Sequence, residues 1–293
     1  MPLTHEHLMF SYNVNFGGTF INQLLLDVCA KNGVSIAELR FGRNQPGVLH
    51  LANHRFVYYT EDKIIYKAAG GGYGGEKEVA LPRQKTYAIG LVRNPFDWYV
   101  GAWSRTCANQ PNIHPLYTGV NDIEGFRTWL KHLMNNDNLD LHIGQYLEGL
   151  LWTPDEGHPN TYKPSLLQYD FGLLSYQVFA LHFGLDHDTW TDSQNINGNM
   201  NFMVCNHGRD TTSIIDNIIP VLQNLGLRCP MKGYKLYKYT NPKTQLTSTP
   251  HLPYQKYYND ETRELVLYKD RYVFDKYGFK FDLLTEEEKK YLC

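Results

Sequence analysis

Residues 85–105 read KTYAIGLVRNPFDWYVGAWSR, and this stretch decides the fold. Residues 86–92 form a nearly continuous apolar run, which is typical of a strand buried on both faces of a sheet. Asn94 and Pro95 then supply a helix cap and a proline at the first helical position, and Asp97 suits the positive end of the helix dipole. The pattern predicts a buried strand that passes directly into a helix.

Arg93 occupies the junction between that strand and that helix. Open α/β sheets bind their ligands at the carboxyl ends of the strands. A guanidinium group is always charged and suits a phosphate or a carboxylate at such a position. The residues alone leave two interpretations open: a ligand-binding arginine, or an arginine paired with a structural carboxylate.

A similar pattern opens the chain. Residues 8–14 predict a strand, and residues 15–19 (NFGGT) follow it as a glycine-containing loop. Apolar residues then recur at helical spacing, and the predicted helix ends near Gly33. Such a loop presents backbone N–H groups and a helix N-terminus to an anion. The sequence GxxxxGK[ST] is absent, which disfavours hydrolysis of a nucleoside triphosphate.

Composition limits the function classes. The 293 residues include 28 lysines and arginines against 30 aspartates and glutamates, a formal charge of −2. Without a general basic field we expect neither broad nucleic-acid binding nor binding of a long sulfated polymer. The five cysteines are widely spaced and form no CxxC pair, so neither a disulfide framework nor a zinc site is indicated. We expect no signal peptide, no membrane span and a cytoplasmic location.

Three segments resemble the family of sulfotransferases that use 3′-phosphoadenosine 5′-phosphosulfate (PAPS), including its carbohydrate and small-molecule members. The segments NVNFGGTF (13–20) and LVRNPFDWYVGAWS (91–104) are similar to the two cofactor signatures of this family. The C-terminal segment 251–281 resembles the family's closing loop and last helix. The resemblance covers residues 8–33, 85–134 and 245–281.

The resemblance implies an α/β fold. We expect a single domain over residues 1–293, with a central, mostly parallel sheet flanked by helices in the P-loop-like nucleotide-binding arrangement of sulfotransferases. Residues 186–212 are rich in Asn and Asp and poor in aliphatic residues. They predict an insertion or a loop, either solvated or lying over an acceptor pocket.

The resemblance also implies the cofactor and its site. PAPS is the donor, adenosine 3′,5′-bisphosphate is the product, and no metal is required. In the family the first loop wraps the 5′-phosphosulfate, and the arginine after the strand reads the 3′-phosphate. The cofactor-binding residues that it implies here are Asn15, Phe16, Gly17, Gly18, Thr19, Phe20, Arg93, Ser104 and Ser248. A small molecule or a short glycan is the expected acceptor, through either an oxygen or a nitrogen atom.

Two residues depart from the family pattern. Asn15 stands where the family usually has a lysine that stabilises the leaving oxygen, and it can donate only a neutral hydrogen bond. Gly101 stands where the family often has a serine, for which Ser104 or Arg105 are the possible substitutes. These departures keep an alternative open, in which a degenerate sulfotransferase fold binds a nucleotide or a partner without turnover. A kinase-like enzyme that binds ATP with magnesium is a third interpretation.

The catalytic residues that we predict are His54, Asn15 and His50. Some carbohydrate sulfotransferases have a catalytic histidine in the region that matches residues 46–60, and a neutral imidazole suits a general base. His54 is the preferred candidate for the general base, and His50 is the second. For each of them the alternative is a histidine without a catalytic role. The weaker candidates for the base or for the acceptor site are Glu76, Glu78 and His114.

Other segments predict structure rather than chemistry. The glycine-rich run 70–75 indicates a hairpin or a lid rather than a phosphate loop. Residues 126–134 carry apolar side chains at helical spacing and predict a helix packed in the core. Residues 214–225 predict an amphipathic helix interrupted by Pro220. A last helix should be capped by Asn259 and run to about Lys276, before Gly278.

Overall fold

The chain divides into two compact units in a computed structural model. One unit, which we call the sheet unit, comprises Met1–Arg93 and Gln177–Thr244, and the other, the helical unit, comprises Asn94–Tyr176 and Gln245–Cys293. The prediction of a single domain over residues 1–293 stays a prediction. The structure describes residues 7–12, 18–37, 48–53, 57–59, 62–67, 78–109, 116–134, 172–176, 178, 200–205, 211–229 and 251–281.

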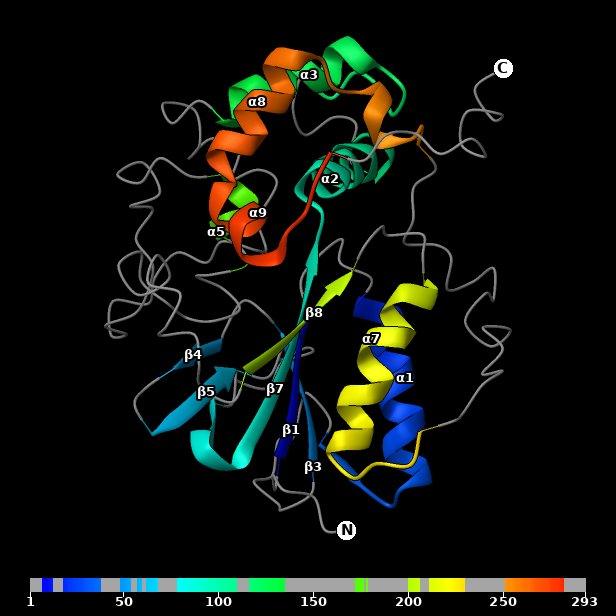
Figure 1. Cartoon of the computed structure of the whole chain (residues 1–293), viewed down its shortest axis with the longest axis vertical. Coiled ribbons are helices and arrows are strands. Elements are labelled where there is room, and N and C mark those ends of the chain that lie inside the picture. The colour runs from blue at the N-terminus through cyan, green and yellow to red at the C-terminus, as the bar shows by residue number, and fades with distance from the viewer. Residues whose placement is uncertain are drawn as a thin grey trace. The chain divides into compact units, whose positions relative to one another are not determined.

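The sheet unit contains a parallel sheet of five strands in the order β2-β3-β1-β7-β8 (Figure 1). The strands are β1 (His7–Tyr12), β2 (Ser35–Ala37), β3 (Val48–Asn53), β7 (Thr86–Arg93) and β8 (Met200–Cys205). All four strand pairs are parallel. The prediction of an α/β fold with a parallel sheet and several helices is therefore confirmed.

Strand β1 lies in the centre of this sheet. It pairs with β3 on one side, where Tyr12 is opposite Asn53, and with β7 on the other, where Ser11 is opposite Gly90. Its residues Met9 and Phe10 are completely buried. Strands that are buried on both faces carry continuous apolar runs, which is why both β1 and β7 could be predicted from the sequence.

The helices α1 (Gly18–Lys31) and α7 (Thr211–Asn224) belong to the same unit (Figure 1). Helix α1 ends as predicted, because Gly33 has a φ of 66° that favours glycine. Pro220 was expected to interrupt α7, and this prediction is wrong. The helix continues through Pro220, which is exposed, so the missing backbone hydrogen bond lies on the solvent side.

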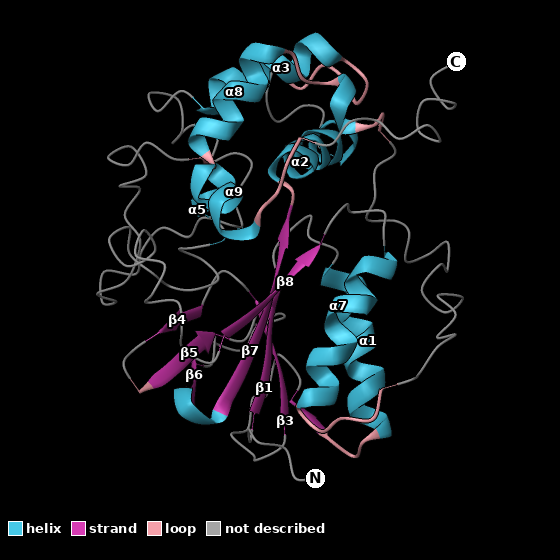
Figure 2. Ribbon diagram, viewed as in Figure 1, coloured by secondary structure: helices cyan, strands magenta, loops and turns pink. Residues whose placement is uncertain are grey.

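A second, antiparallel sheet consists of β4 (Val57–Tyr59), β5 (Lys63–Lys67) and β6 (Glu78–Pro82) (Figure 2). Because Lys67 pairs with Glu78, the chain between β5 and β6 joins two antiparallel neighbours. This pairing agrees with a hairpin at the glycine-rich run 70–75. The run itself lies outside the described residues.

Strand β8 is a correction to the sequence analysis. Residues 186–212 were predicted to be a loop or an insertion, yet residues 200–205 form the strand that pairs with β7. In NMNFMVC (199–205) asparagine alternates with apolar residues, and only four of the seven residues are Met, Phe or Val. The strand is specified by its pairing with β7, which is more than 100 residues away, rather than by a strong local pattern.

The helical unit has a core of aromatic side chains. Its elements are α2 (Pro95–Asn109), α3 (Ile123–Met134), α5 (Leu173–Tyr176), the 3₁₀ turn η8 (Tyr254–Lys256), α8 (Asp260–Lys269) and α9 (Arg271–Tyr277) (Figure 2). Trp103, Phe126 and Trp129 are buried and in ring contact with one another. The apolar residues of 126–134 are thus core residues, as predicted. Buried aromatic pairs of this kind stabilise a core beyond the area that they bury.

Two asparagines cap helices as predicted. The Oδ1 atom of Asn94 accepts a hydrogen bond from the backbone N–H of Phe96 at 3.1 Å, at the start of α2. The side chain of Asn259 accepts from the N–H of Thr262 at 2.9 Å, and the Thr262 hydroxyl in turn accepts from the N–H of Asn259 at 3.1 Å. This reciprocal capping box satisfies two backbone donors at the start of α8.

The C-terminal helix differs from its prediction. A single helix was expected from Asn259 to about Lys276, but the chain breaks at Asp270 into α8 and α9. The backbone of Asp270 leaves helical geometry, with φ −104° and ψ 22°. Its carboxylate is completely buried and bonded to other segments, and these distant bonds set the break. Gly278 ends α9 with a φ of 67°, as predicted.

The capping box gives a test of this fold. We expect Asn259→Ala to lower the free energy of unfolding by about 1 kcal/mol, because the backbone N–H of Thr262 loses its acceptor. Asp260→Ala is the matched control, since it removes an exposed charge and its ion pair with Arg263 from the same first turn but leaves the capping box intact. Thermal unfolding should show a fall of a few degrees for Asn259→Ala. Equal melting temperatures for the two variants would contradict the cap.

Candidate functional site

The sheet changes its winding direction between β1 and β7. From β1 the chain passes through α1 to β2 and β3 on one side, whereas β7 and then β8 lie on the other side. Adjacent parallel strands whose connections leave in opposite directions form a topological switch point. Ligands of open α/β sheets bind beside the carboxyl ends of the strands at this point. The carboxyl edge of β1 and β7 is therefore the candidate site.

Helix α1 begins directly after the loop that follows β1. Its first residues, Gly18, Thr19 and Phe20, are helical. The first N–H groups of any helix have no carbonyl partner within that helix and carry the positive end of its dipole. They form a binding site for a phosphate or a sulfate group when a loop brings such a ligand to them. The predicted loop residues Asn15, Phe16 and Gly17 lie outside the described residues.

Arg93 is the last residue of β7, where it pairs with Cys205 of β8. The register of β1 and β7 brings Ser11 opposite Gly90, so Tyr12 and Arg93 both lie at the carboxyl edge of the sheet. Arg93 is only 7% exposed and interacts with other protein groups. A guanidinium with so little access to water needs charged or polar partners to offset its desolvation. Arg93 is thus a buried cation with protein partners at the switch point, which fits both interpretations of this residue: a ligand-binding arginine and an arginine paired with a structural carboxylate.

The two predicted histidines differ in position along β3. His50 lies in the middle of the strand, opposite Met9 of β1 and Ala37 of β2. It precedes the last residue of β3, Asn53, by three residues, which is about 10 Å of extended chain. His54 follows Asn53 in the sequence but lies outside the described residues. Of the two, His50 belongs to the interior of the sheet rather than to its carboxyl edge.

The two residues of α2 that could substitute for the serine missing at Gly101, Ser104 and Arg105, differ in their burial. Among residues 95–108, all are buried except Gly101, Arg105 and Ala108, which follow one another at helical spacing. Ser104 is completely buried, and its hydroxyl makes no hydrogen bond within the described part of the chain. A ligand in solution can reach Arg105 without any movement of the core, whereas Ser104 is closed to it.

Of the other predicted candidates, only some lie within the described residues. Ser248, Glu76 and His114 lie outside the described residues. Glu78 begins β6, where its backbone pairs with Lys67. No group of three or more His, Cys, Asp or Glu side chains within the described residues could hold a metal ion.

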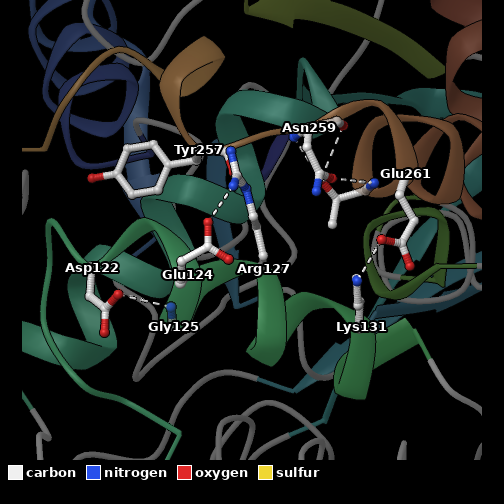
Figure 3. A network of polar contacts seen from close by, with 9 residues as sticks. Asp122, Glu124, Gly125, Arg127, Lys131, Tyr257, Asn259 and Glu261 are labelled. Carbon is white, nitrogen blue, oxygen red and sulfur yellow. Dashed lines mark hydrogen bonds and ion pairs between the residues drawn. The ribbon is translucent and has the colours of Figure 1, made fainter.

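A polar network that sequence reasoning missed joins α3 to α8 in the helical unit (Figure 3). Arg127 of α3 donates through Nε to the backbone oxygen of Tyr257 at 2.9 Å and forms an ion pair with Glu124. Lys131 contacts Glu261 of α8 at 2.6 Å. The Tyr257 hydroxyl donates to the carbonyl of Val120 at 2.7 Å. The two bonds of Tyr257 fix the segment before α8, and their donors and acceptors lie 130 and 137 residues apart in sequence.

Asp270 is a completely buried carboxyl group of this unit with a perturbed pKa. It accepts hydrogen bonds from the Tyr99 hydroxyl at 2.7 Å and from the backbone N–H of Ser175 at 2.8 Å. The Tyr99 oxygen in turn accepts from the N–H of Leu174 at 3.2 Å. Burial raises the pKa of Asp270 to about 6, although these hydrogen bonds and the charge of Lys269 lower it in part. Complete burial gives this network a structural rather than a catalytic role.

Glycine is required beside this carboxylate. A Cβ atom at Gly172 would lie 2.5 Å from an oxygen of Asp270, much closer than such atoms approach. The backbone N–H of Gly172 donates to the carbonyl of Lys269 at 2.7 Å, which holds the two segments at this distance. Because its neighbours come from three separate segments, the sequence around Asp270 contains no local signal for the network.

The raised pKa of Asp270 predicts a pH-dependent stability. Its ordinary pKa is 3.8, so the folded protein binds this proton more tightly than the unfolded chain does. The stabilisation is complete below about pH 4 and is lost as the pH rises through about 6. A shift of about two units corresponds to about 3 kcal/mol. Relative to Asp270→Asn, the wild type should lose about this much unfolding free energy between pH 4 and pH 7 in urea denaturation.

Asp122 provides a control of opposite sign. Hydrogen bonds from the Thr118 hydroxyl and the Gly125 N–H lower the pKa of this exposed carboxyl group. Its stabilisation is therefore present above the ordinary pKa and is lost toward low pH. The unfolding free energy of the wild type relative to Asp122→Asn should therefore fall slightly toward low pH.

For Asp270 the contradicting outcome is a difference between wild type and Asp270→Asn that does not change with pH. It would show that Asp270 titrates normally.

No protein-family model matches this chain, and no curated protein matches it significantly. No helix within the described residues is long and apolar enough to cross a membrane. The function therefore has to be inferred from the position of the residues at the switch point.

Proposed function

We propose that this chain is a sulfotransferase that moves a sulfuryl group from PAPS to a hydroxyl or an amine of a small molecule or a short glycan. The sheet would then be the P-loop-like nucleotide-binding core of the sulfotransferase fold. The product of the donor would be adenosine 3′,5′-bisphosphate, and the transfer would be an in-line displacement at sulfur.

One observation carries this proposal. The two segments that resemble cofactor signatures are 70 residues apart in sequence, yet they leave adjacent parallel strands, β1 and β7, at the same edge of the sheet. If the resemblance had arisen by chance, there would be no reason for these two segments to lie at the same edge of the sheet. This edge is also the switch point, where sheets of this class bind their ligands.

The donor has two charged regions, and the edge offers two kinds of partner for them. The first N–H groups of α1, at Gly18, Thr19 and Phe20, suit the 5′-phosphosulfate, with Asn15, Phe16 and Gly17 completing the loop. Arg93 suits the 3′-phosphate, because its planar guanidinium can donate two parallel hydrogen bonds to one phosphate. Ser104 and Arg105, the two candidates by resemblance for the serine missing at Gly101, belong to the helical unit, and of the two only Arg105 keeps access to solvent. Ser248 remains a proposed contact by resemblance.

The chemistry requires an acceptor made nucleophilic and charge stabilisation on the leaving phosphate. In this proposal His54 removes the proton from the acceptor, since it follows the last residue of β3, which neighbours β1. His50 is the weaker candidate because it lies three residues before the strand end. Asn15 donates a hydrogen bond to the leaving oxygen, and the N–H groups of α1 add their partial charge.

A binding protein without turnover is the second candidate, and two residues favour it. Asn15 removes a positive charge from the loop where a sulfotransferase stabilises its leaving group, and Gly101 removes a hydroxyl. Neither change affects the N–H groups of α1 or Arg93. Such a chain would keep its affinity for the nucleotide while losing the rate of transfer.

Nucleotide binding tests the donor site. Adenosine 3′,5′-bisphosphate at about 100 times its dissociation constant should stabilise the protein by about 2.7 kcal/mol, which raises the melting temperature by several degrees. AMP and Mg-ATP are the controls and should have little effect. Arg93→Ala should abolish the shift, whereas Arg228→Ala should retain it. An equal response to Mg-ATP would favour a kinase-like enzyme, and no response to any nucleotide would end the proposal.

Transfer is tested with PAPS and a panel of phenols, alcohols, amines and short glycans. The release of adenosine 3′,5′-bisphosphate should increase when an acceptor is present. His54→Ala should lower that rate by about 10² to 10⁴ with unchanged affinity for the bisphosphate, because a general base contributes about this factor. His50→Ala should retain the rate if the protein folds. Equal losses in both variants would contradict the role of His54.

The same assay separates the two candidate functions. A protein that binds the bisphosphate but transfers to no acceptor supports the binding function. Asn15→Lys should then restore a measurable rate if the missing charge is the cause. If the wild type already transfers, Asn15→Lys should change the rate little, because another cation serves the leaving group.

A further inference from the structure

Two hydrogen bonds between Asn32 and Arg228, which we call the clasp, join the end of α1 to the chain that follows α7. The Nδ2 atom of Asn32 donates to the carbonyl of Arg228 at 3.0 Å, and the N–H of Arg228 donates to Oδ1 of Asn32 at 2.7 Å. Asn32 also donates to the carbonyl of Val28 in the last turn of α1 at 2.7 Å. Figure 1 shows these two helix ends side by side in the sheet unit. The side chain of Asn32 thus binds the backbone of Arg228, which is 196 residues away in the sequence.

A cysteine accompanies each half of this clasp. Cys29 precedes Asn32 by three residues on α1, and its carbonyl accepts from the N–H groups of Asn32 and Val34 at 3.1 Å and 2.9 Å. Cys229 directly follows Arg228. Both are free thiols, Cys29 buried and Cys229 partly exposed. The clasp therefore brings the backbone of the two cysteines into the same small region.

The two thiols also affect each other electrostatically. Burial raises the pKa of Cys29 to about 12, and charge on Cys229 is the second cause of this shift. Burial likewise raises the pKa of Cys229 to about 11. An electrostatic effect of this kind falls off with distance, so it indicates that the two thiols lie in the same neighbourhood. It agrees with the position that the hydrogen bonds of Asn32 give to the two segments.

We propose that Cys29 and Cys229 form a disulfide under sustained exposure to a disulfide oxidant such as oxidised glutathione, and that this bond locks α1 to the chain after α7. The thiolate of the accessible Cys229 attacks oxidised glutathione, and a glutathione thiolate leaves. The thiolate of Cys29 then attacks the sulfur of Cys229, and a second glutathione leaves. Two cysteines lose two electrons to one oxidised glutathione, and their two protons pass to the two glutathione thiolates.

The environment of the two thiols sets the rate at which the disulfide forms. Only the thiolate is a nucleophile, and a thiol with a pKa of about 11 is ionised to about one part in 10⁴ at pH 7. The pair thus stays reduced during a brief oxidation and reacts during a long one. The bond would close a loop of about 200 residues, which constrains the unfolded chain strongly. It would also fix the helix whose other end begins at the candidate anion site.

Peptide mapping of the full chain tests the lock. The protein is incubated with oxidised glutathione at pH 7 and pH 9, blocked with N-ethylmaleimide and digested without reduction. We expect a peptide that links Cys29 to Cys229, formed about 100-fold faster at pH 9 because the thiolate fraction rises by that factor. The oxidised wild type should melt several degrees higher than the reduced protein. Cys107→Ser, a buried cysteine of the helical unit, should behave as the wild type does.

Two variants make the test decisive. Cys229→Ser, at a partly exposed position, should lose both the linked peptide and the rise in melting temperature. Asn32→Ala should accumulate the mixed disulfide of Cys229 with glutathione, because it removes the bonds that bring Cys29 near. A mixed disulfide that also persists in the wild type would show that the two sulfur atoms do not meet. That result, or the absence of any linked peptide at pH 9, would overturn the proposal.

Discussion

The parallel pairing of β1 with β7 is the constraint on which the sheet unit depends. It brings Ser11 opposite Gly90 and so aligns the carboxyl ends of two strands that are about 80 residues apart. A shift of one residue would exchange the faces on which the buried Met9 and Phe10 lie, and their different side chains would then have to fit each other's packing sites. The position of α1 relative to Arg93 follows from this register.

The sequence predicted the elements whose signals are local. The apolar run of β7, the Asn94 cap of α2 and the glycine stop at Gly33 each lie within a few residues of the structure that they specify. The sequence did not predict β8 or the break at Asp270. Strand β8 depends on its pairing with β7, and the break depends on Tyr99 and Ser175, which are 171 and 95 residues away. Interactions over such separations leave no periodic pattern.

The candidate site was predictable to the same extent. Arg93 and the start of α1 could be found because each follows a strong strand pattern, and the structure brings both to one edge. The choice between Ser104 and Arg105 could not be made from the sequence, because they follow Gly101 by three and four residues and so lie about equally close to it on α2. The structure distinguishes their burial, since Ser104 is completely buried and Arg105 is not. A hydroxyl in a helix gives no sign of its burial until the neighbouring helices are known.

In the proposed function, binding and transfer would depend on different atoms at this edge. The N–H groups of α1 and the guanidinium of Arg93 would contact phosphate oxygens that carry charge both before and during the reaction. Such contacts stabilise the ground state and the transition state about equally, so they give affinity without rate. Rate requires stabilisation of the bridging oxygen, which gains charge only as the bond to sulfur breaks. At that oxygen the proposed site would offer the neutral amide of Asn15. The position of one further positive charge would then decide whether such a site only holds a sulfated nucleotide or also uses it.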